Sequence, residues 1–244
     1  MGKYSSYLNI YEKDIPLPSS KEIVKIKPLT TNQIKKLLVH ENETDLIGGE
    51  KILDDVLRLS VVSEDKEFLK TLFLQDRYYL FVEIRNLTKG SQHTYSFTCP
   101  SCNGQSIQSI DLKSLEIKDM KPITETVDIV NGTLKLHMRY VTRGMQEEAY
   151  ATIDPKLPNS EKQVEMALAN MAQAIEFVET PDGKDEPTIK EKMDLIGDIP
   201  SHEYERLKDW FMDHDFGINL NVVTKCPYCS FEEKHSLPLN NFFL

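Results

Sequence analysis

The sequence predicts an α+β fold in which two cysteine-containing turns from distant segments come together. All four cysteines fall in two C-x-x-C pairs, Cys99 with Cys102 and Cys226 with Cys229. Alternating, strand-like segments lie on both sides of each pair. The long stretch between the pairs has mainly helical spacing of its apolar residues, interrupted by one hairpin pattern.

Before the first cysteine pair, the patterns predict one strand followed by three helices. Residues 22–29 alternate as a short strand, and Thr30–Gln33 has the spacing of a capping box that starts a helix. Apolar residues at helical spacing between 52 and 59 predict a second helix. Asp76 is expected to cap a third helix, which Gly90 ends before the first cysteine strand begins.

The middle of the chain predicts a hairpin and then a long helix. Residues 126–141 alternate around Asn131–Gly132, a pair that favours a tight primed turn. Ser160–Gln163 has the form of a second capping box. The core stripe expected on the helix that follows comprises Val164, Ala167, Leu168, Met171, Ala174, Ile175 and Val178.

The last segments before the second cysteine pair are a turn and two short helices. Residues 180–187 have the composition of a turn or linker. Helical spacing recurs at 189–196 and at 201–214, where Ser201 is expected to cap the second helix. Gly217 is expected to stop this helix and to begin the strand that leads to Cys226.

These elements predict two domains. Residues 1–104 and 218–244 are expected to form N-terminal helices and a composite ribbon. Residues 105–217 are expected to form an inserted domain with a β-hairpin and helices. The insertion is long because 123 residues separate the inner cysteines Cys102 and Cys226.

The cysteine pairs predict a structural zinc site with the ligands Cys99, Cys102, Cys226 and Cys229. A zinc ion prefers four soft ligands in a tetrahedron, and two tight turns with two thiolates each supply them. A redox motif is the less favoured interpretation, because it expects one such pair at the start of a helix. Two disulfides are possible only in an oxidising compartment. His93 and His235 flank the pairs as spare ligands, supporting partners or ordinary strand residues.

Composition and missing motifs argue against several functions. The chain has 244 residues and a net charge of −10, and residues 91–110 contain no charged residue, so we expect no nucleic-acid partner. No apolar run approaches the ~20 residues that cross a bilayer, so we expect a soluble, intracellular protein without a membrane partner. Common nucleotide-binding and hydrolase motifs are absent from the sequence. We therefore predict that the chain is not an enzyme.

One segment carries a family resemblance. It begins with Ile26–Thr30 and continues with Asp76–Arg85, Thr88–Gly90 and the first cysteine pair. In these motifs the chain resembles baseplate hub assembly proteins of T4-like, contractile-tailed bacteriophages. The resemblance implies a non-enzymatic structural or assembly component that binds other baseplate proteins. It also implies a location in the host cytoplasm during assembly and in the tail baseplate. The alternative function is a zinc-ribbon adaptor or regulator that binds nucleic acid, and an unrecognised hydrolase is a third class.

Two further features are candidates for contacts. Arg85 lies on an otherwise apolar helix, where its guanidinium either extends past the core to water or pairs with a carboxylate. Phe242, Phe243 and Leu244 end the chain with an apolar tail. We expect this tail to insert into a groove on a neighbouring baseplate protein, with packing on its own domain as the alternative.

Overall fold

The chain forms a mixed structure of helices and strands, which confirms the predicted α+β class. No helix in the described part of the chain has both the length and the apolar character needed to span a membrane. The computed structural model describes residues 11–40, 46–65, 67–239 and 242–243.

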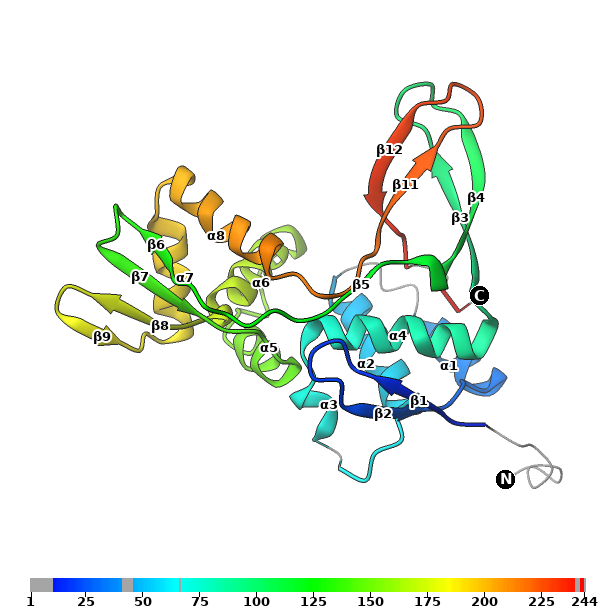
Figure 1. Cartoon of the computed structure of the whole chain (residues 1–244), viewed down its shortest axis with the longest axis horizontal. Coiled ribbons are helices and arrows are strands. Elements are labelled where there is room, and N and C mark those ends of the chain that lie inside the picture. The colour runs from blue at the N-terminus through cyan, green and yellow to red at the C-terminus, as the bar shows by residue number, and fades with distance from the viewer. Residues whose placement is uncertain (1–10, 41–45, 66, 240–241, 244) are drawn as a thin grey trace. The chain divides into compact units, whose positions relative to one another are not determined.

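The chain divides into two compact units (Figure 1). Unit 1 consists of Met1–Glu64, Arg77–Asp119 and Gly217–Leu244, and unit 2 consists of Asp65–Asp76 and Met120–Phe216. Each unit therefore combines segments that are far apart in the sequence. Whether the units fold as independent domains stays a prediction.

Unit 1 contains a strand pair, helices and two hairpins that carry the cysteines. Its main elements are β1 (Lys13–Pro16), β2 (Ile23–Ile26), α1 (Thr31–His40), α2 (Leu46–Ser60), α4 (Leu74–Lys89), β3 (Gln92–Thr98), β4 (Gln105–Asp111), β5 (Ile117–Lys118), β10 (Gly217–Ile218), β11 (Asn221–Lys225) and β12 (Glu232–Ser236). The first turn of α4 belongs to unit 2 by its contacts. A short 3-10 helix, η2 (Leu112–Ser114), follows β4.

The helix boundaries of unit 1 follow the predicted signals in two of three cases. The capping box before α1 is present, because the Thr30 N–H donates to Gln33 Oε1 over 2.7 Å and the Gln33 N–H donates to Thr30 Oγ1 over 3.3 Å. Gly90 ends α4 with φ +88°. The predicted cap at Asp76 is wrong, since α4 begins at Leu74 and Asp76 lies in its first turn. The Leu74 N–H donates to the carbonyl of Val141, so a backbone acceptor satisfies the first N–H of this helix.

Arg85 is buried, with 5% of its surface exposed, and it ties three segments of unit 1 together. Its guanidinium donates to the carbonyls of Phe242 over 3.1 Å and Gln92 over 2.9 Å, and to the carbonyl of Gly90. Both interpretations of Arg85 from the sequence are wrong, because the side chain neither reaches water nor pairs with a carboxylate in these bonds. It satisfies backbone carbonyls where α4, β3 and the C-terminal tail meet.

The C-terminal tail packs into its own unit. Phe242 is 1% exposed and Phe243 is 5% exposed. Phe81 of α4 stacks on Phe242 with ring centroids 5.4 Å apart, and it meets Phe243 edge-on at 5.3 Å. The expected insertion into a neighbouring protein is therefore wrong for these two residues. Leu244 lies outside the described residues.

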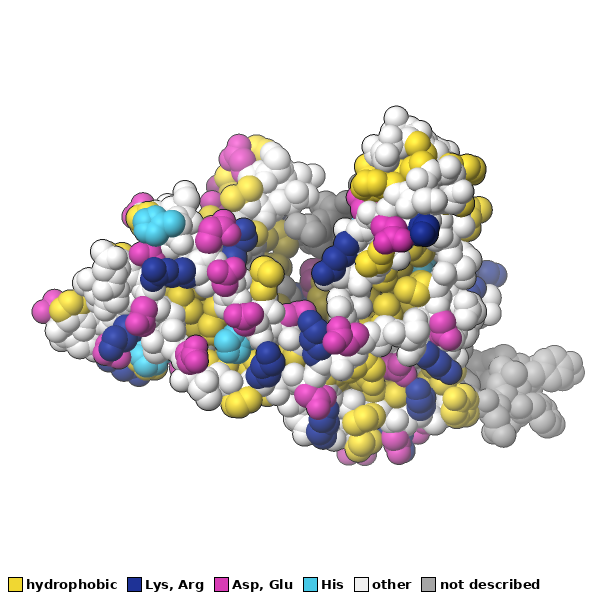
Figure 2. Space-filling model, turned by 45° about the horizontal axis from the view of Figure 1, so that its top comes forward, with side chains coloured by type: hydrophobic (Ala, Val, Ile, Leu, Met, Phe, Trp, Pro, Cys, Tyr) yellow, Lys and Arg dark blue, Asp and Glu magenta, His cyan; other side chains and the backbone are white. Residues whose placement is uncertain are grey.

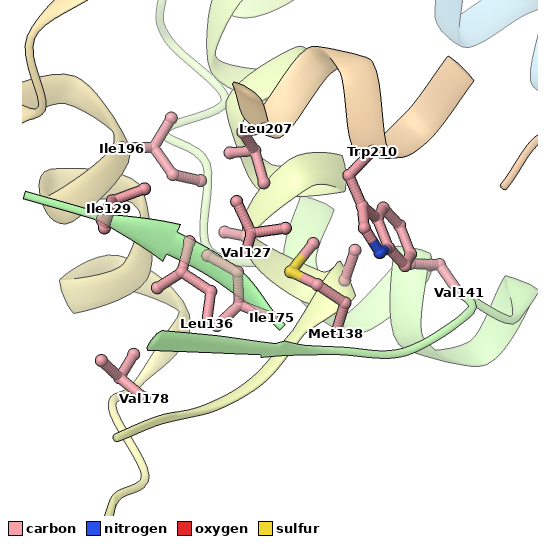
Figure 3. Close-up of a cluster of buried hydrophobic side chains, with 12 residues drawn as sticks. Val127, Ile129, Leu136, Met138, Val141, Ile175, Val178, Ile196, Leu207 and Trp210 are labelled. Atoms are coloured by element: carbon pink, nitrogen blue, oxygen red, sulfur yellow. The ribbon is translucent and has the colours of Figure 1, made fainter. Parts of the chain in front are cut away.

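Unit 2 is an antiparallel sheet covered by helices. The sheet order is β6-β7-β8-β9. Its core joins apolar residues of the sheet, such as Leu136 and Ile175, to Ile196 and Leu207 on the helices (Figure 3). The elements are α3 (Phe68–Thr71), β6 (Val127–Ile129), β7 (Leu134–Met138), α5 (Arg143–Tyr150), α6 (Asn159–Ala174), β8 (Ile175–Thr180), β9 (Gly183–Asp185), α7 (Ile189–Asp198) and α8 (Ser201–Asp213).

The hairpin of unit 2 is confirmed, but its turn differs from the prediction. Ile129 pairs with Leu134, so residues 130–133 form a four-residue loop instead of a two-residue turn. Val130, Asn131 and Gly132 all have positive φ, at 52°, 55° and 80°. The loop thus has three successive left-handed residues, one more than the two of a primed two-residue turn.

The long helix of unit 2 starts and ends earlier than predicted. Its N-cap is Pro158, which leaves Ser160 inside the first turn, where it cannot form the predicted capping box. Ile175 and Val178 lie in β8 instead of on the helix, and Val164 is 60% exposed. Pairing with β7 explains the strand, because β-branched residues pack well in a half-buried sheet.

Two smaller predictions for unit 2 are also corrected. Residues 180–187 include β9, whose Gly183 pairs with Thr180 of β8 across a short turn. Ser201 is the first residue of α8, and Pro200 occupies the N-cap position instead. Proline, which fixes φ, occupies the N-cap position of both α6 and α8, and neither helix start has a side-chain cap hydrogen bond.

Candidate metal centre

Two antiparallel hairpins of unit 1 bring the cysteines together (Figure 1). Strand β3 pairs with β4 from Gln92↔Asp111 to Thr98↔Gln105, and β11 pairs with β12 from Asn221↔Ser236 to Lys225↔Glu232. Each cysteine pair occupies the turn that joins its two strands. The strands predicted on both sides of the cysteines are thus confirmed.

Side chains between the hairpins hold them in contact below the turns. Phe97, Cys99 and Cys226 form a buried cluster, against which Tyr95 packs. The hydroxyls of Tyr95 and Thr224 lie 2.6 Å apart, so a hydrogen bond joins β3 to β11. These contacts place both turns at the same end of the paired hairpins.

The two cysteine turns have the same backbone geometry. The N–H of Cys99 donates to Gly104 O over 3.0 Å, as that of Cys226 donates to Phe231 O over 2.8 Å. Asn103 and Ser230, each four residues after the first cysteine, donate back to its carbonyl and have positive φ of 55° and 61°. The sequence therefore folds twice into the same knuckle.

The four sulfur atoms lie within 4.8 Å of one another. Sγ of Cys99 is 3.7 Å from that of Cys229, and Sγ of Cys102 is 3.7 Å from that of Cys226. A disulfide requires about 2.05 Å. Four sulfurs in a tetrahedron, each about 2.3 Å from one ion, stand roughly 3.8 Å apart. The arrangement is compatible with a metal site and with the predicted zinc-ribbon fold.

The thiols influence one another's protonation. A backbone hydrogen bond from Gly104 favours the thiolate of Cys102, but the neighbouring thiols and burial outweigh it and raise the pKa of Cys102 to about 12. Burial disfavours the thiolate of Cys226, yet backbone N–H groups of Cys229 and Tyr228 help to lower its pKa to about 7. Cys226 therefore loses its proton readily, whereas the neighbouring sulfurs and burial oppose a second negative charge on Cys102. A divalent cation removes this opposition because it offsets the thiolate charges.

The two histidines near the cysteines lie outside the sulfur cluster. His93 is 4% exposed, and its ring meets Phe242 edge-on with centroids 4.8 Å apart. His235 Nε2 lies 2.8 Å from Thr224 Oγ1. Burial, followed by the charge of Arg85, lowers the pKa of His93. Both histidines therefore act in packing between β3, β11, β12 and the tail.

Gly104 and Tyr228 make a contact at this centre that the cysteine motifs did not predict. Tyr228 Oη donates to Gln105 O over 3.0 Å and so joins the second knuckle to the first. Gly104 leaves the space that the Tyr228 ring occupies. The only signal in the sequence is the difference between Ser101 and Tyr228 at equivalent positions of the two pairs.

The chain matches the model of one protein family, described as T4 bacteriophage base plate protein, over residues 9–244. No curated protein and no solved structure gives a significant match. The family match spans both units and both cysteine pairs, and it extends far beyond the segments that carried the resemblance in the sequence. The chain therefore belongs to the T4 bacteriophage base plate protein family, whose description indicates a structural component of the phage tail.

Proposed function

We propose that the protein is a non-enzymatic structural or assembly component of the baseplate hub, and that one structural zinc ion closes its ribbon. The family match over residues 9–244 carries the baseplate assignment. The convergence of four sulfurs carries the zinc assignment. The ligands are Cys99, Cys102, Cys226 and Cys229.

The donor set favours zinc and a structural role. Four thiolates whose sulfurs lie within 4.8 Å of one another suit the preference of zinc for soft ligands and four-coordinate geometry. Because four protein ligands fill all positions, no open position remains for a substrate or an activated water molecule. The ion would stabilise the fold of the ribbon, and structural zinc sites contribute about 10 kcal/mol or more at neutral pH.

Zinc would also join two segments of the chain that are distant in the sequence. The two knuckles are 123 residues apart in the sequence, between Cys102 and Cys226. All of unit 2 except Asp65–Asp76 lies in this interval. A metal clip that closes such a long loop restricts the unfolded chain strongly. We propose that the two units are separate domains and that the zinc closes the loop from which unit 2 extends.

Other baseplate proteins are the proposed partners. The net charge of −10 favours partners with basic surfaces, because charge complementarity accelerates association and suppresses incorrect contacts. The protein would fold in the host cytoplasm during assembly and enter the baseplate of the tail.

Infected cells provide the test. Phage that encode Cys226→Ser, and control phage that encode Ser101→Ala, would be grown in parallel, and the baseplate hubs would be isolated and quantified by mass spectrometry. Ser101 lies between the ligands of the first pair and contributes no thiol, so the control keeps all four. We expect the control to enter hubs at the wild-type level and Cys226→Ser to be depleted. Absence of the wild-type chain from hubs and from their assembly intermediates would refute the hub assignment.

A further inference from the structure

The two knuckles are related by an approximate two-fold symmetry. Their backbone hydrogen bonds are the same, and the two 3.7 Å sulfur contacts exchange under this symmetry, because each joins the first cysteine of one pair to the second cysteine of the other. The symmetry places Ser101 at the position equivalent to Tyr228. It places Gly104 at the position equivalent to Phe231.

The side chains break this symmetry at one contact. A Cβ atom added to Gly104 would lie 2.6 Å from Cδ2 of Tyr228, 3.2 Å from Cε2 of the same ring and 3.2 Å from Sγ of Cys102. Real Cβ atoms essentially never approach another atom as closely as 2.6 Å. A Cβ atom at this position would therefore force the Tyr228 side chain, whose residue is 68% exposed, out of the place it occupies over Gly104. Residues 99–104 and 226–231 contain no Lys, Arg, Asp or Glu, and uncharged side chains cover this end of the ribbon on the face that Figure 2 shows.

The contact excludes the pairing of two second knuckles. In such a pair, Phe231 would take the place of Gly104 beneath the partner's tyrosine, where a Cβ atom would force the ring out of its place. Two first knuckles would bring Ser101 over Gly104 and leave the space of the tyrosine ring empty. Only the pair of unlike knuckles combines a large residue with a glycine.

We propose that the packing of Tyr228 on Gly104, called the steric key below, makes the first knuckle pair only with the second knuckle and not with a copy of itself. This inference rests on the proposed zinc centre. It explains how a chain with two similar pairs of zinc ligands avoids being bridged by the ion to a second copy of itself. The hydrogen bond from Tyr228 Oη to Gln105 O adds directionality to the key.

The test is a double-mutant cycle on the zinc-loaded full chain. The variants are Gly104→Ala, Tyr228→Ser and their combination, with Ser101→Ala as the control at the equivalent position. Gly104 lacks a positive φ, so alanine there acts through its contacts with Tyr228 and Cys102 and not through backbone strain. The readouts are zinc content, the rate of zinc transfer to a chromogenic chelator, and mass by light scattering after refolding with zinc.

We expect each single variant to release zinc about fivefold to tenfold faster than wild type, since the loss of one contact or hydrogen bond has about this effect. Adding Tyr228→Ser should abolish most of the effect of Gly104→Ala, because the ring at 2.6 Å is gone and only the approach of 3.2 Å to Cys102 Sγ remains. Gly104→Ala alone should form dimers that a chelator dissociates, because first knuckles can still pair with each other. The control should behave as wild type.

The outcomes separate the key from the metal centre. If wild type binds one zinc but the single variants release it at the wild-type rate and form no metal-dependent dimers, the key is refuted and the zinc centre stands. Additive effects in the double variant also refute the key. If purified wild type holds no zinc, the zinc centre fails and the key fails with it.

Discussion

Replacing Arg85 by lysine should destabilise unit 1 and leave unit 2 unchanged. The guanidinium donates to the carbonyls of Gly90 and Gln92, where α4 leads into β3, and to that of Phe242 in the C-terminal tail. A lysine keeps the positive charge but lacks the planar fork that reaches several acceptors at once. We expect it to serve one of the three carbonyls and to leave two without a donor.

The size of the effect follows from these two lost bonds. Each net hydrogen bond contributes about 1 kcal/mol, and a buried acceptor left unsatisfied costs about 1–3 kcal/mol. The expected loss is therefore about 2–3 kcal/mol. With a urea dependence of about 2 kcal/mol per M, the unfolding midpoint of unit 1 should fall by about 1 M.

The chain allows each unit to be followed separately. Trp210, its single tryptophan, lies in α8 of unit 2, so tryptophan fluorescence reports unfolding of that unit. Release of zinc to a chromogenic chelator reports opening of the ribbon in unit 1. The matched control is Arg58→Lys, because the Arg58 side chain is 72% exposed on α2. An unchanged zinc-release midpoint in Arg85→Lys, or an equal shift of the Trp210 signal, would refute this reasoning.

Two further substitutions test the packing of each unit. Phe242→Ala removes a buried ring that stacks on Phe81, and it should lower the stability of unit 1 by about 3–5 kcal/mol, measured by urea unfolding. Wild-type stability in this variant would show that the tail is not part of the core. Burial lowers the pKa of Lys192 below the ordinary value of 10.5 because it disfavours the charged ammonium. The folded state is therefore most stable, with respect to this group, above pH 10.5, and it loses stability as the pH falls through the lowered pKa and the buried amine takes up a proton. Lys192→Met removes both this pH-dependent cost and the hydrogen bond that Lys192 Nζ donates to Glu176 O over 3.2 Å. The melting temperature of unit 2 in the variant should therefore fall relative to wild type as the pH rises from 7 towards 10.5, and a difference that does not change with pH would contradict this expectation.

Local signals in the sequence predicted the elements that depend on neighbouring residues. The capping box at Thr30, the left-handed end at Gly90 and the repeated cysteine turns each need only a few consecutive residues. The same logic failed for Ser160, because Pro158 fixes the helix start first. Propensity also could not show that Ile175 leaves the helix, since its strand needs β7, which lies 37 residues earlier at Met138.

Features that depend on distant partners were not predictable from local patterns. Phe242 is apolar in sequence whether it docks on another protein or on Phe81. Arg85 gave no sign of its carbonyl partners, because backbone acceptors leave no mark in the sequence. The cysteines were the exception, since a metal site constrains residue type and spacing at both ends of a long loop.

The most direct test of the zinc-closed ribbon is X-ray absorption at the zinc edge, combined with elemental analysis of the purified protein. We expect one zinc per chain with four sulfur neighbours at about 2.3 Å. Cys226→Ser should lose zinc or replace one sulfur neighbour by a lighter atom. A chain without bound zinc, or one in which mass spectrometry finds Cys99, Cys102, Cys226 and Cys229 joined in disulfides, would contradict the proposed centre.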